Sequence, residues 1–386
     1  MAFSDKILFI SLYEPNKYGG RVGGTVILIN DILSAVDSNY DVDLIVYKKD
    51  DIESDLPQNV KFRPWSSIAR KDAKWSLKSK LPKGLYKDYS SYFIDAEGYS
   101  KIVFYPYFCS LFNLENAKGT IYTIGMDSGP MLYLRGYLNH KNVKNKLFCL
   151  YEYFQALSID KKAASVSQKV FCVGETDAAY YRCAYSSDAR FVHHPVTSLI
   201  DSYTPIKWEY NQKLKLCFPG GMTEFYTKGL AEKIIDLIGN ESNYFKDKIE
   251  ISFLGQVKYS ALKNSLAKVT RLGISVNYTE FAKNFEEYLS NQHLILLPLV
   301  VGVGTKNKTL SSLGMGLDMI GTPIAMENVY GVRDIHVAKD AFEFLWKIKK
   351  RIEQRKLFGL SSDEIDEFKK YHSVSNWRTS FWGELN

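Results

Sequence analysis

Short apolar segments alternate with amphipathic segments along most of the chain. In the first half, runs of β-branched and aromatic residues have the length of strands and are separated by stretches with apolar residues at helical spacing. The predicted strands are 6–12, 42–47, 101–107, 119–125, 169–174 and 190–193. Helices are predicted at 25–36 and 142–167. This alternation indicates βαβ units around a parallel sheet.

A polar stretch interrupts the pattern between residues 197 and 212, with Pro205 at its middle. The alternation then begins again. Further strands are predicted at 213–218, 250–254, 273–277, 294–299 and 319–323, and helices at 228–238, 259–269, 284–291 and 308–315. We therefore predict an α/β protein of two Rossmann-like, doubly wound domains with a cleft between them, followed by a helix from residue 363.

Length and composition agree with this division. A chain of 386 residues is long enough for two domains, and 46% hydrophobic with 24% charged residues excludes a disordered or fibrous chain. The five cysteines form no C-x-x-C, which argues against a zinc site or a disulfide framework. The longest apolar run, 294–304, is about half of what a bilayer span needs, and the first apolar residues are those of a strand rather than a signal peptide.

The net charge of +7 is concentrated in one segment. Residues 63–93 contain eight lysines and arginines against two aspartates, with tryptophans and tyrosines between them. Such a mixture suits an anionic membrane surface, and a solvated loop is the alternative. Neither half of the chain contains a recognised nucleic-acid-binding module, so we expect no nucleic-acid partner.

The strongest candidate site lies between a buried strand and a helix, at residues 302–308. Its glycines allow a ligand to approach the backbone, Thr305 or Asn307 can cap the helix, and two lysines add positive charge where the helix dipole favours phosphate. The spacing is not that of a Walker A loop. The residues that we expect to bind phosphate here are Gly304, Thr305, Lys306, Asn307 and Lys308.

Two further candidate turns follow predicted strands. A glycine-rich turn after the first strand contains Gly20, Gly23 and Gly24, but it is not a G-x-G-x-x-G motif. Gly220 and Gly221 follow the strand 213–218, and Lys228 opens the next helix. A plain flexible turn and a surface lysine are the alternatives.

Asp127 follows the strand 119–125 and is expected to face the cleft, because ligands of open parallel sheets lie outside the carboxyl ends of the strands. A turn-forming aspartate is the alternative. Glu175 also follows a predicted strand, 169–174, but we favour a helix-capping role for this turn. Asp41 and Asp43 spell D-x-D inside a strand, and the pair His193 and His194 has no third ligand at metal spacing, so no metal site is predicted.

These segments together resemble the GT-B glycosyltransferases, and most closely the nucleotide-sugar-dependent family 4. The resemblance rests on 169–178, on 218–222 with Lys228 and Gly229, and on the segment 304–310 with the glycines that follow it, where Glu327 fits an acidic position. It implies an amino-terminal acceptor domain at 1–200 with the basic segment 63–93, a donor domain at 201–362, and a helix at 363–386 that crosses back to the first domain.

The resemblance also implies roles for the candidate residues. Lys228 and the residues 304–308 hold the donor diphosphate, while Gly220, Gly221, Ser311 and Glu327 lie near the nucleoside and the sugar. Gly20, Gly23 and Gly24 lie on the opposite side of the cleft, beside the donor and the acceptor. Asp127 is the candidate general base of an inverting enzyme, or orients the sugar in a retaining one. No cofactor and no metal are expected, because charge stabilisation of the departing nucleoside diphosphate suffices.

The sequence departs from the family at three places. Gly221 stands where an arginine is usual, Ser311 stands where a glutamate is usual, and the paired-glutamate motif is absent. The implied function is transfer of a sugar from a nucleotide sugar to a glycan or lipid-linked acceptor. The implied setting is bacterial surface polysaccharide or lipopolysaccharide synthesis, in the cytoplasm or peripherally on the inner membrane. A non-catalytic GT-B homologue and a nicotinamide-dependent oxidoreductase are the alternatives.

Overall fold

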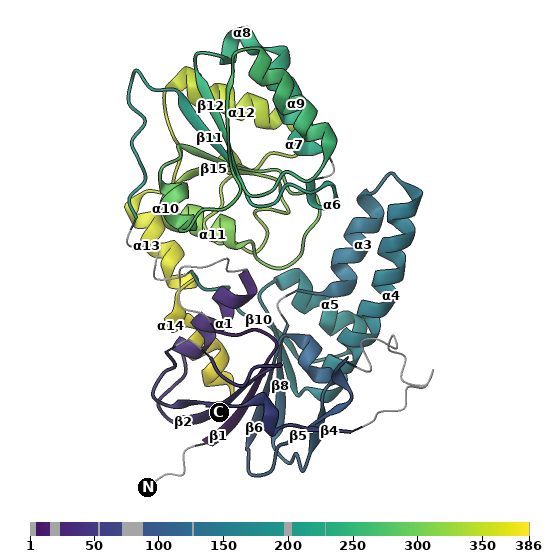
Figure 1. Ribbon diagram of the computed structural model, residues 1–386. Coiled ribbons are helices and arrows are strands. Elements are labelled where there is room, and N and C mark those ends of the chain that lie inside the picture. The colour runs from purple at the N-terminus through teal and green to yellow at the C-terminus, as the bar shows by residue number, and fades with distance from the viewer. Residues whose placement is uncertain are drawn as a thin grey trace. The chain divides into compact units, whose positions relative to one another are not determined.

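The computed structural model describes residues 5–15, 24–52, 55–71, 88–125, 127–196, 203–227 and 229–385. Contacts divide the chain into two units, and each has its own parallel sheet (Figure 1). Of the described residues, those from 5 to 195 and from 373 to 385 belong to unit 1, and those from 196 to 372 belong to unit 2. The boundaries expected from the sequence lie at 200/201 and 362/363.

The sheet of unit 1 has seven strands in the order β10-β9-β8-β6-β1-β2-β3, all parallel. Its strands are β1 (Asp5–Ser11), β2 (Tyr40–Val46), β3 (Val60–Arg63), β6 (Lys101–Tyr105), β8 (Thr120–Gly125), β9 (Lys169–Cys172) and β10 (Ala189–Phe191). A small second sheet contains β4 (Ala69–Arg70), β5 (Tyr92–Asp95) and β7 (Asn113–Glu115). The buried, nearly continuous apolar strands are those expected of a parallel sheet.

The helices described in unit 1 before its last segment are α1 (Gly24–Ser34), α3 (Gly129–Asn139), α4 (Val143–Val166) and α5 (Glu175–Tyr185). Figure 1 shows α3 and α4 lying side by side as a helical hairpin. The sequence predicted α4 within a residue at each end but did not predict α3. That helix begins at Gly129 and Pro130 and contains Gly136, all poor helix formers, and the Ser128 hydroxyl caps it.

The sheet of unit 2 has five parallel strands in the order β13-β12-β11-β14-β15. They are β11 (Leu214–Pro219), β12 (Ile249–Leu254), β13 (Ser275–Thr279), β14 (Leu294–Leu297) and β15 (Asp318–Gly321). The helices are α6 (Glu224–Thr227), α7 (Leu230–Asn240), α8 (Ser242–Phe245), α9 (Ser260–Arg271), α10 (Phe285–Ser290), α11 (Asn307–Gly314), α12 (Ala341–Gln354) and α13 (Ser362–Tyr371).

The order of winding reverses between β11 and β14, which are neighbours in the sheet. In open α/β sheets, ligands bind at such a switch point, outside the carboxyl ends of the strands. The loop after β11 contains Gly220 and Gly221, and the loop after β14 leads to α11. The fold of unit 2 thus places the two loops that the sequence singled out at its switch point.

The chain end packs into unit 1. After α13, which belongs to unit 2, the segment 373–386 returns to the first sheet through α14 (Val374–Trp377) and a π-helical turn at Arg378–Trp382. The Trp382 indole N–H donates to the Ile32 carbonyl at 2.9 Å, and the Trp377 indole N–H donates to the His193 carbonyl at 2.8 Å. Both indoles are buried in the core of the unit.

Candidate functional site

At the switch point of unit 2, Lys308 and Gly220 lie against each other. Gly220 has a positive φ of 88°, and a Cβ atom added to it would overlap the Lys308 Nζ atom. Gly255, at the end of β12, lies so close that its Cβ would meet the Gly220 backbone. The absence of side chains at these two positions therefore lets the loops after β11 and β12 close around the lysine.

The Lys308 ammonium is held in a poorly solvated place. Burial lowers the pKa of Lys308 from its usual 10.5 to about 8. Among the residues that the structure describes, no carboxylate pairs with this ammonium. A partly buried positive charge that has no counter-ion is suited to an anionic ligand, whose binding supplies the missing charge.

The start of α11 adds donors to the same place. Lys306 is the N-cap residue, and no side chain caps the helix, although the sequence had suggested Thr305 or Asn307 for that role. The buried Nδ2 atom of Asn307 has no hydrogen-bond partner in the described part of the chain. Since the first N–H groups of a helix also have no partner within it, α11 begins with several donors that favour an anion.

Lys306 folds back onto its own loop. Its ammonium donates hydrogen bonds of 2.7 Å to the carbonyl oxygens of Val303 and Gly304. A Cβ at Gly302 would lie 2.8 Å from the Lys306 Cε atom, so that glycine makes room for the side chain. The structure shows Lys306 bracing the loop, and its contact with a phosphate stays a prediction.

The segment after β15 forms hydrogen bonds with this loop and with α11. The Thr309 hydroxyl donates to the Ala325 carbonyl at 2.6 Å, and the Asn328 amide donates to the Gly304 carbonyl at 3.2 Å. Glu327 lies between Ala325 and Asn328 in the sequence and is half-buried. The predicted acidic position is thereby brought beside the loop 302–306.

Glu286 is a buried carboxylate that the sequence analysis did not single out. It lies in the first turn of α10, and the Ser311 hydroxyl of α11 donates to its Oε1 atom at 3.4 Å. Burial raises its pKa. Ser311 stands where the resembling family has a glutamate, so Glu286 brings a carboxylate to that neighbourhood from another helix. Its position early in α10 looks like ordinary helix-start chemistry in the sequence.

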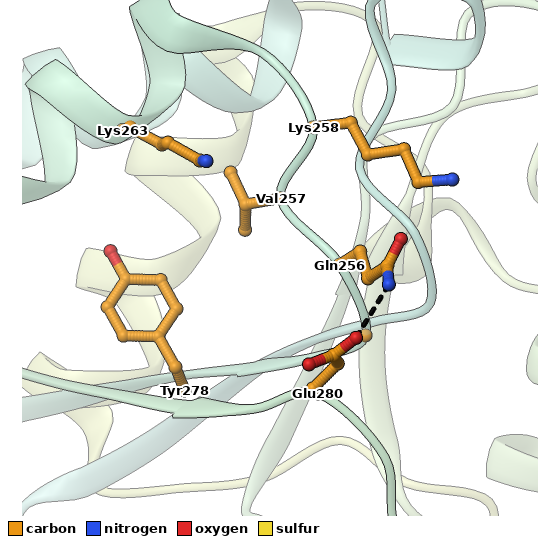
Figure 2. A pocket seen from close by; sticks show the side chains of 7 residues that line it. Gln256, Val257, Lys258, Lys263, Tyr278 and Glu280 are labelled. Carbon is orange, nitrogen blue, oxygen red and sulfur yellow. Dashed lines mark hydrogen bonds between the residues drawn. The ribbon is translucent and has the colours of Figure 1, made fainter.

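A pocket opens beside these loops, at the carboxyl ends of β12 and β13 (Figure 2). It has a volume of about 770 Å³. The residues that line it are Gly255, Gln256, Val257, Lys258, Lys263, Tyr278 and Glu280. Gln256 donates to Glu280 at 2.6 Å, and the Met222 N–H donates to the Gln256 carbonyl at 3.0 Å, which ties the pocket to the loop after β11.

Figure 2 shows the aromatic ring of Tyr278 and the ammonium of Lys263 on the same side of the pocket. Tyr278 is 57% exposed and its ring also stacks on Phe253. An exposed ring supported from behind offers a flat face to a planar group, and Lys258 and Lys263 add positive charge. The glycine at position 255 was the one signal in the sequence that could have drawn attention to this strand end.

In unit 1, Asp127 follows β8 as predicted and is half-buried. Its charge contributes to raising the pKa values of Tyr105 and Tyr107, after the larger effect of their burial. It therefore lies near these phenols. Its role in catalysis stays a prediction.

Two buried acids hold the turn that carries Asp127. The Ser128 N–H donates to Asp177 Oδ1 at 2.8 Å, and the Ser128 hydroxyl donates to Asp160 Oδ2 at 3.3 Å. Burial raises the pKa of Asp160 well above its usual value, so this acid is protonated more readily than an exposed one. Asp177 lies in the first turn of α5, and the structure shows that it also positions the turn after β8.

Several predicted residues lie outside the described part of the chain. These are Gly20, Gly23, Lys228 and most of the basic segment 63–93. Gly24 is described only as the first residue of α1. Trp65, at the beginning of the basic segment, packs on Tyr47 and Tyr92 in the core of unit 1, so this aromatic side chain is not presented to a partner.

The residues set aside as metal ligands have other partners. Asp43 forms an ion pair with Lys6 at 3.1 Å, and Asp41 forms one with Lys61 at 3.2 Å, both across strands of the sheet. His194 is buried, and burial lowers its pKa to about 4. Within the described ranges, no cluster of His, Cys, Asp and Glu side chains could hold a metal ion.

No family model matches the sequence, and no curated protein matches it. Solved structures do match its fold over nearly the whole chain. Anabaena HepE in complex with UDP is 12% identical, with 98% of this chain and 99% of that chain covered and a TM-score of 0.61. The lipopolysaccharide outer core galactosyltransferase WaaB is 12% identical, with coverages of 98% and 99% and a TM-score of 0.57.

The chain has the GT-B fold. A third structure with this likeness is the N-terminal domain of Candida albicans trehalose-6-phosphate phosphatase, which is 12% identical, with coverages of 99% and 96% and a TM-score of 0.58. The predicted fold class, an α/β chain with two Rossmann-like parts, is confirmed by these matches and by the two parallel sheets.

Proposed function

We propose that this GT-B protein is a glycosyltransferase that takes a sugar from a nucleoside-diphosphate donor. The observation that carries the proposal is the Lys308 ammonium, which lies against Gly220 at the switch point of unit 2, beside the amino end of α11. A loop that brings a lysine and helix N–H groups together binds pyrophosphate well.

The same residues support the chemical step. When the bond between the sugar and the diphosphate breaks, negative charge develops on the diphosphate oxygen. Lys308 and the first N–H groups of α11 stabilise that charge, and they are in position before the reaction, so little reorganisation is needed. The proposed mechanism uses these groups in place of a metal ion, and the nucleotide sugar is a substrate rather than a cofactor.

The nucleoside has two candidate contacts in unit 2. The pocket at Gly255–Glu280 offers the Tyr278 ring to a base, and Glu286 with Ser311 offers a carboxylate and a hydroxyl to the ribose. HepE, which shares the fold, was crystallised with UDP and with UDP-glucose. A uridine nucleotide is therefore the first donor to test.

The acceptor is proposed to be a glycan or a lipid-linked glycan in bacterial surface polysaccharide or lipopolysaccharide synthesis. WaaB is a lipopolysaccharide outer core galactosyltransferase, and WaaG, a further structure with this fold, is involved in lipopolysaccharide biosynthesis. Asp127 accepts the proton of the attacking hydroxyl if the enzyme inverts, and orients the sugar if it retains.

The proposal is tested by measuring donor hydrolysis and transfer with a panel of UDP-, GDP- and ADP-sugars. We expect slow hydrolysis of one donor, with loss of this activity in Lys308→Met. The matched control is Lys233→Met, which removes an exposed lysine of α7 in the same unit. Nucleotide binding without turnover of any donor would identify a non-catalytic protein with this fold, and turnover of a nicotinamide cofactor would contradict the proposal.

A further inference from the structure

The helical hairpin of α3 and α4 presents an unusual number of apolar side chains to solvent. In the described part of the chain, more than half of the large exposed apolar residues belong to these two helices. They are Leu134, Tyr137, Leu138, Val143, Leu147, Phe148, Leu150, Tyr151 and Phe154. Exposed apolar side chains concentrated in this way on two helices that pack together mark an interaction site.

Five of the six large exposed apolar residues described in α4 follow one stripe of the helix. Val143, Leu147, Leu150, Tyr151 and Phe154 recur at the spacing of one helical face. A second apolar stripe, with Cys149, Ala156, Ile159 and Ala163, is buried against the unit. Because α4 has two apolar stripes and the unit covers one of them, the other stripe is left for a partner.

The charges beside this surface indicate what the partner is. Residues 129–151 contain four basic side chains, Arg135, Lys141, Lys144 and Lys146, and no aspartate or glutamate. Lys141 and Lys144 lie at the tip of the hairpin and are exposed. The Lys146 ammonium lies 5.3 Å from the centre of the Tyr137 ring, which joins the two helices. A second copy of the chain would bring like charges together, whereas an anionic surface would neutralise them.

We propose that the α3–α4 hairpin docks this protein on an anionic lipid bilayer. The apolar side chains enter the boundary between headgroups and acyl chains, and the lysines at the tip contact anionic headgroups. Tyrosines suit this depth, because they combine an apolar ring with a polar end. The hairpin lies on the bilayer: none of the helices described here is long and apolar enough to cross a membrane.

This docking does not depend on the donor site. The hairpin belongs to unit 1, and the candidate diphosphate site belongs to unit 2. The proposal also differs from the membrane contact predicted for the segment 63–93, since the hairpin lies elsewhere in the chain. A bilayer-bound enzyme would meet lipid-linked acceptors at the surface where they are anchored, which connects the inference to the proposed function.

The experiment is co-sedimentation of the 386-residue chain with vesicles of phosphatidylcholine alone and with vesicles that contain phosphatidylglycerol. We expect binding to the anionic vesicles that weakens with added salt. The variant Lys141→Gln/Lys144→Gln is expected to bind about 30-fold more weakly, from the contribution of each lysine near an anionic surface. Its matched control is Lys161→Gln/Lys162→Gln, two exposed lysines near the other end of α4, which should bind as the wild type does.

A second pair of variants tests the apolar contribution. Leu138→Gln/Leu147→Gln removes two hairpin residues that are 68% and 62% exposed, and we expect binding to fall at least about tenfold. The control, Phe342→Gln/Trp346→Gln, removes two similarly exposed residues of α12 and should leave binding unchanged. Thermal unfolding identifies any variant that fails to fold, and UDP binding of the folded variants should equal that of the wild type.

The proposal is overturned if the wild-type protein does not bind anionic vesicles, or if the hairpin variants bind them as tightly as their controls. It is also overturned if the wild type is a dimer without lipid and Leu138→Gln/Leu147→Gln makes it a monomer, because the hairpin would then be an interface between copies. Loss of UDP binding with intact vesicle binding would contradict the proposed function and leave the docking proposal supported.

Discussion

The strand ends of the two units carry opposite kinds of chemistry. In unit 2, Lys308, Lys258 and Lys263 gather near the ends of β11 and β12, and the pKa of Lys308 is lowered to about 8 by burial. In unit 1, Asp127 follows the end of β8. The buried Asp160 accepts a hydrogen bond from Ser128, the residue after Asp127. We propose that one Rossmann-like sheet prepares a site for an anion, and that the other prepares a site for a group that gives up a proton. This division suits a reaction with a diphosphate leaving group and a hydroxyl acceptor.

The largest effect is expected from Asp127→Asn, if Asp127 is the general base. The amide cannot accept the proton of the acceptor hydroxyl, so kcat should fall about 100- to 10,000-fold. The Kd for UDP should not change, because the proposed contacts to the diphosphate belong to unit 2. Steady-state kinetics and calorimetry with UDP measure these two quantities. Asp188→Asn, an exposed aspartate of unit 1 paired with Arg190, is the control.

An Asp127→Asn enzyme that keeps most of its turnover with the same stereochemistry would remove both proposed roles of this residue. The contrast between the two units would then rest on the proposed donor site of unit 2 alone.

Lys308→Met should weaken the binding of UDP by about 100-fold, since a charge-assisted hydrogen bond in a poorly solvated site is lost. Methionine keeps much of the length of the side chain without its charge. Isothermal titration calorimetry checks the result, and Lys233→Met should bind UDP as the wild type does. Equal affinity in the two variants would show that the diphosphate binds elsewhere.

The variants Gly220→Ala and Gly221→Ala compare a glycine that lies against Lys308 with a glycine that has space around it. A methyl group at Gly220 would overlap the Lys308 ammonium and strain a backbone with positive φ. We expect Gly220→Ala to weaken UDP binding by about tenfold through displacement of that charge. At Gly221 the nearest atom, the Gln256 carbonyl oxygen, would be 3.8 Å away, so that variant should be neutral.

The affinity for UDP should fall as the pH rises through the pKa of Lys308. With a pKa of about 8 in the free protein, most molecules carry the ammonium at pH 7 and few carry it at pH 9. We expect about a tenfold loss of affinity across this range. The unfolded lysine keeps its usual pKa of 10.5, so the stability of the free protein should rise with pH between these two values. Lys308→Met should remove both dependences.

The smallest expected effect is an increase in the affinity for UDP. The resembling family has an arginine at position 221, and the structure leaves open space around Gly221. Gly221→Arg should therefore strengthen UDP binding a few-fold by adding a second cation near the diphosphate. Calorimetry measures the gain, and Gly221→Ala serves as its control. Weaker binding by the arginine variant would show that this loop is not near the diphosphate.

The sequence predicted the parts of the fold that have a strong periodic pattern. The alternation of strands and helices identified both sheets, and the restart after residue 212 corresponds to β11. The helix α3 was missed because Gly129, Pro130 and Gly136 weaken its helical pattern, although packing on α4 stabilises it. Tertiary contacts decide such a helix more than its own propensity does.

The site could be predicted only where it lies in one continuous stretch. Residues 302–308 carry their glycines and lysines together, so the loop before α11 was identified directly. The contact between Gly220 and Lys308 depends on the pairing of β11 with β14, which no local pattern reveals. The same holds for Glu286, whose proximity to Ser311 arises from the packing of α10 on α11.

The charge distribution along the chain indicated only one of the two basic segments. Counting along the chain directed attention to 63–93, where basic residues outnumber acidic ones most strongly. The four basic residues of 129–151 are offset by acids elsewhere in the chain and are revealed as a surface only by the hairpin.

A crystal structure of the protein with bound UDP tests the central claim most directly. We predict that the β-phosphate lies within hydrogen-bonding distance of the Lys308 ammonium and of the first N–H groups of α11, with the nucleoside directed toward the loops after β12 and β13. A structure in which UDP binds away from the amino end of α11, with Lys308 in contact only with the protein, would contradict the account.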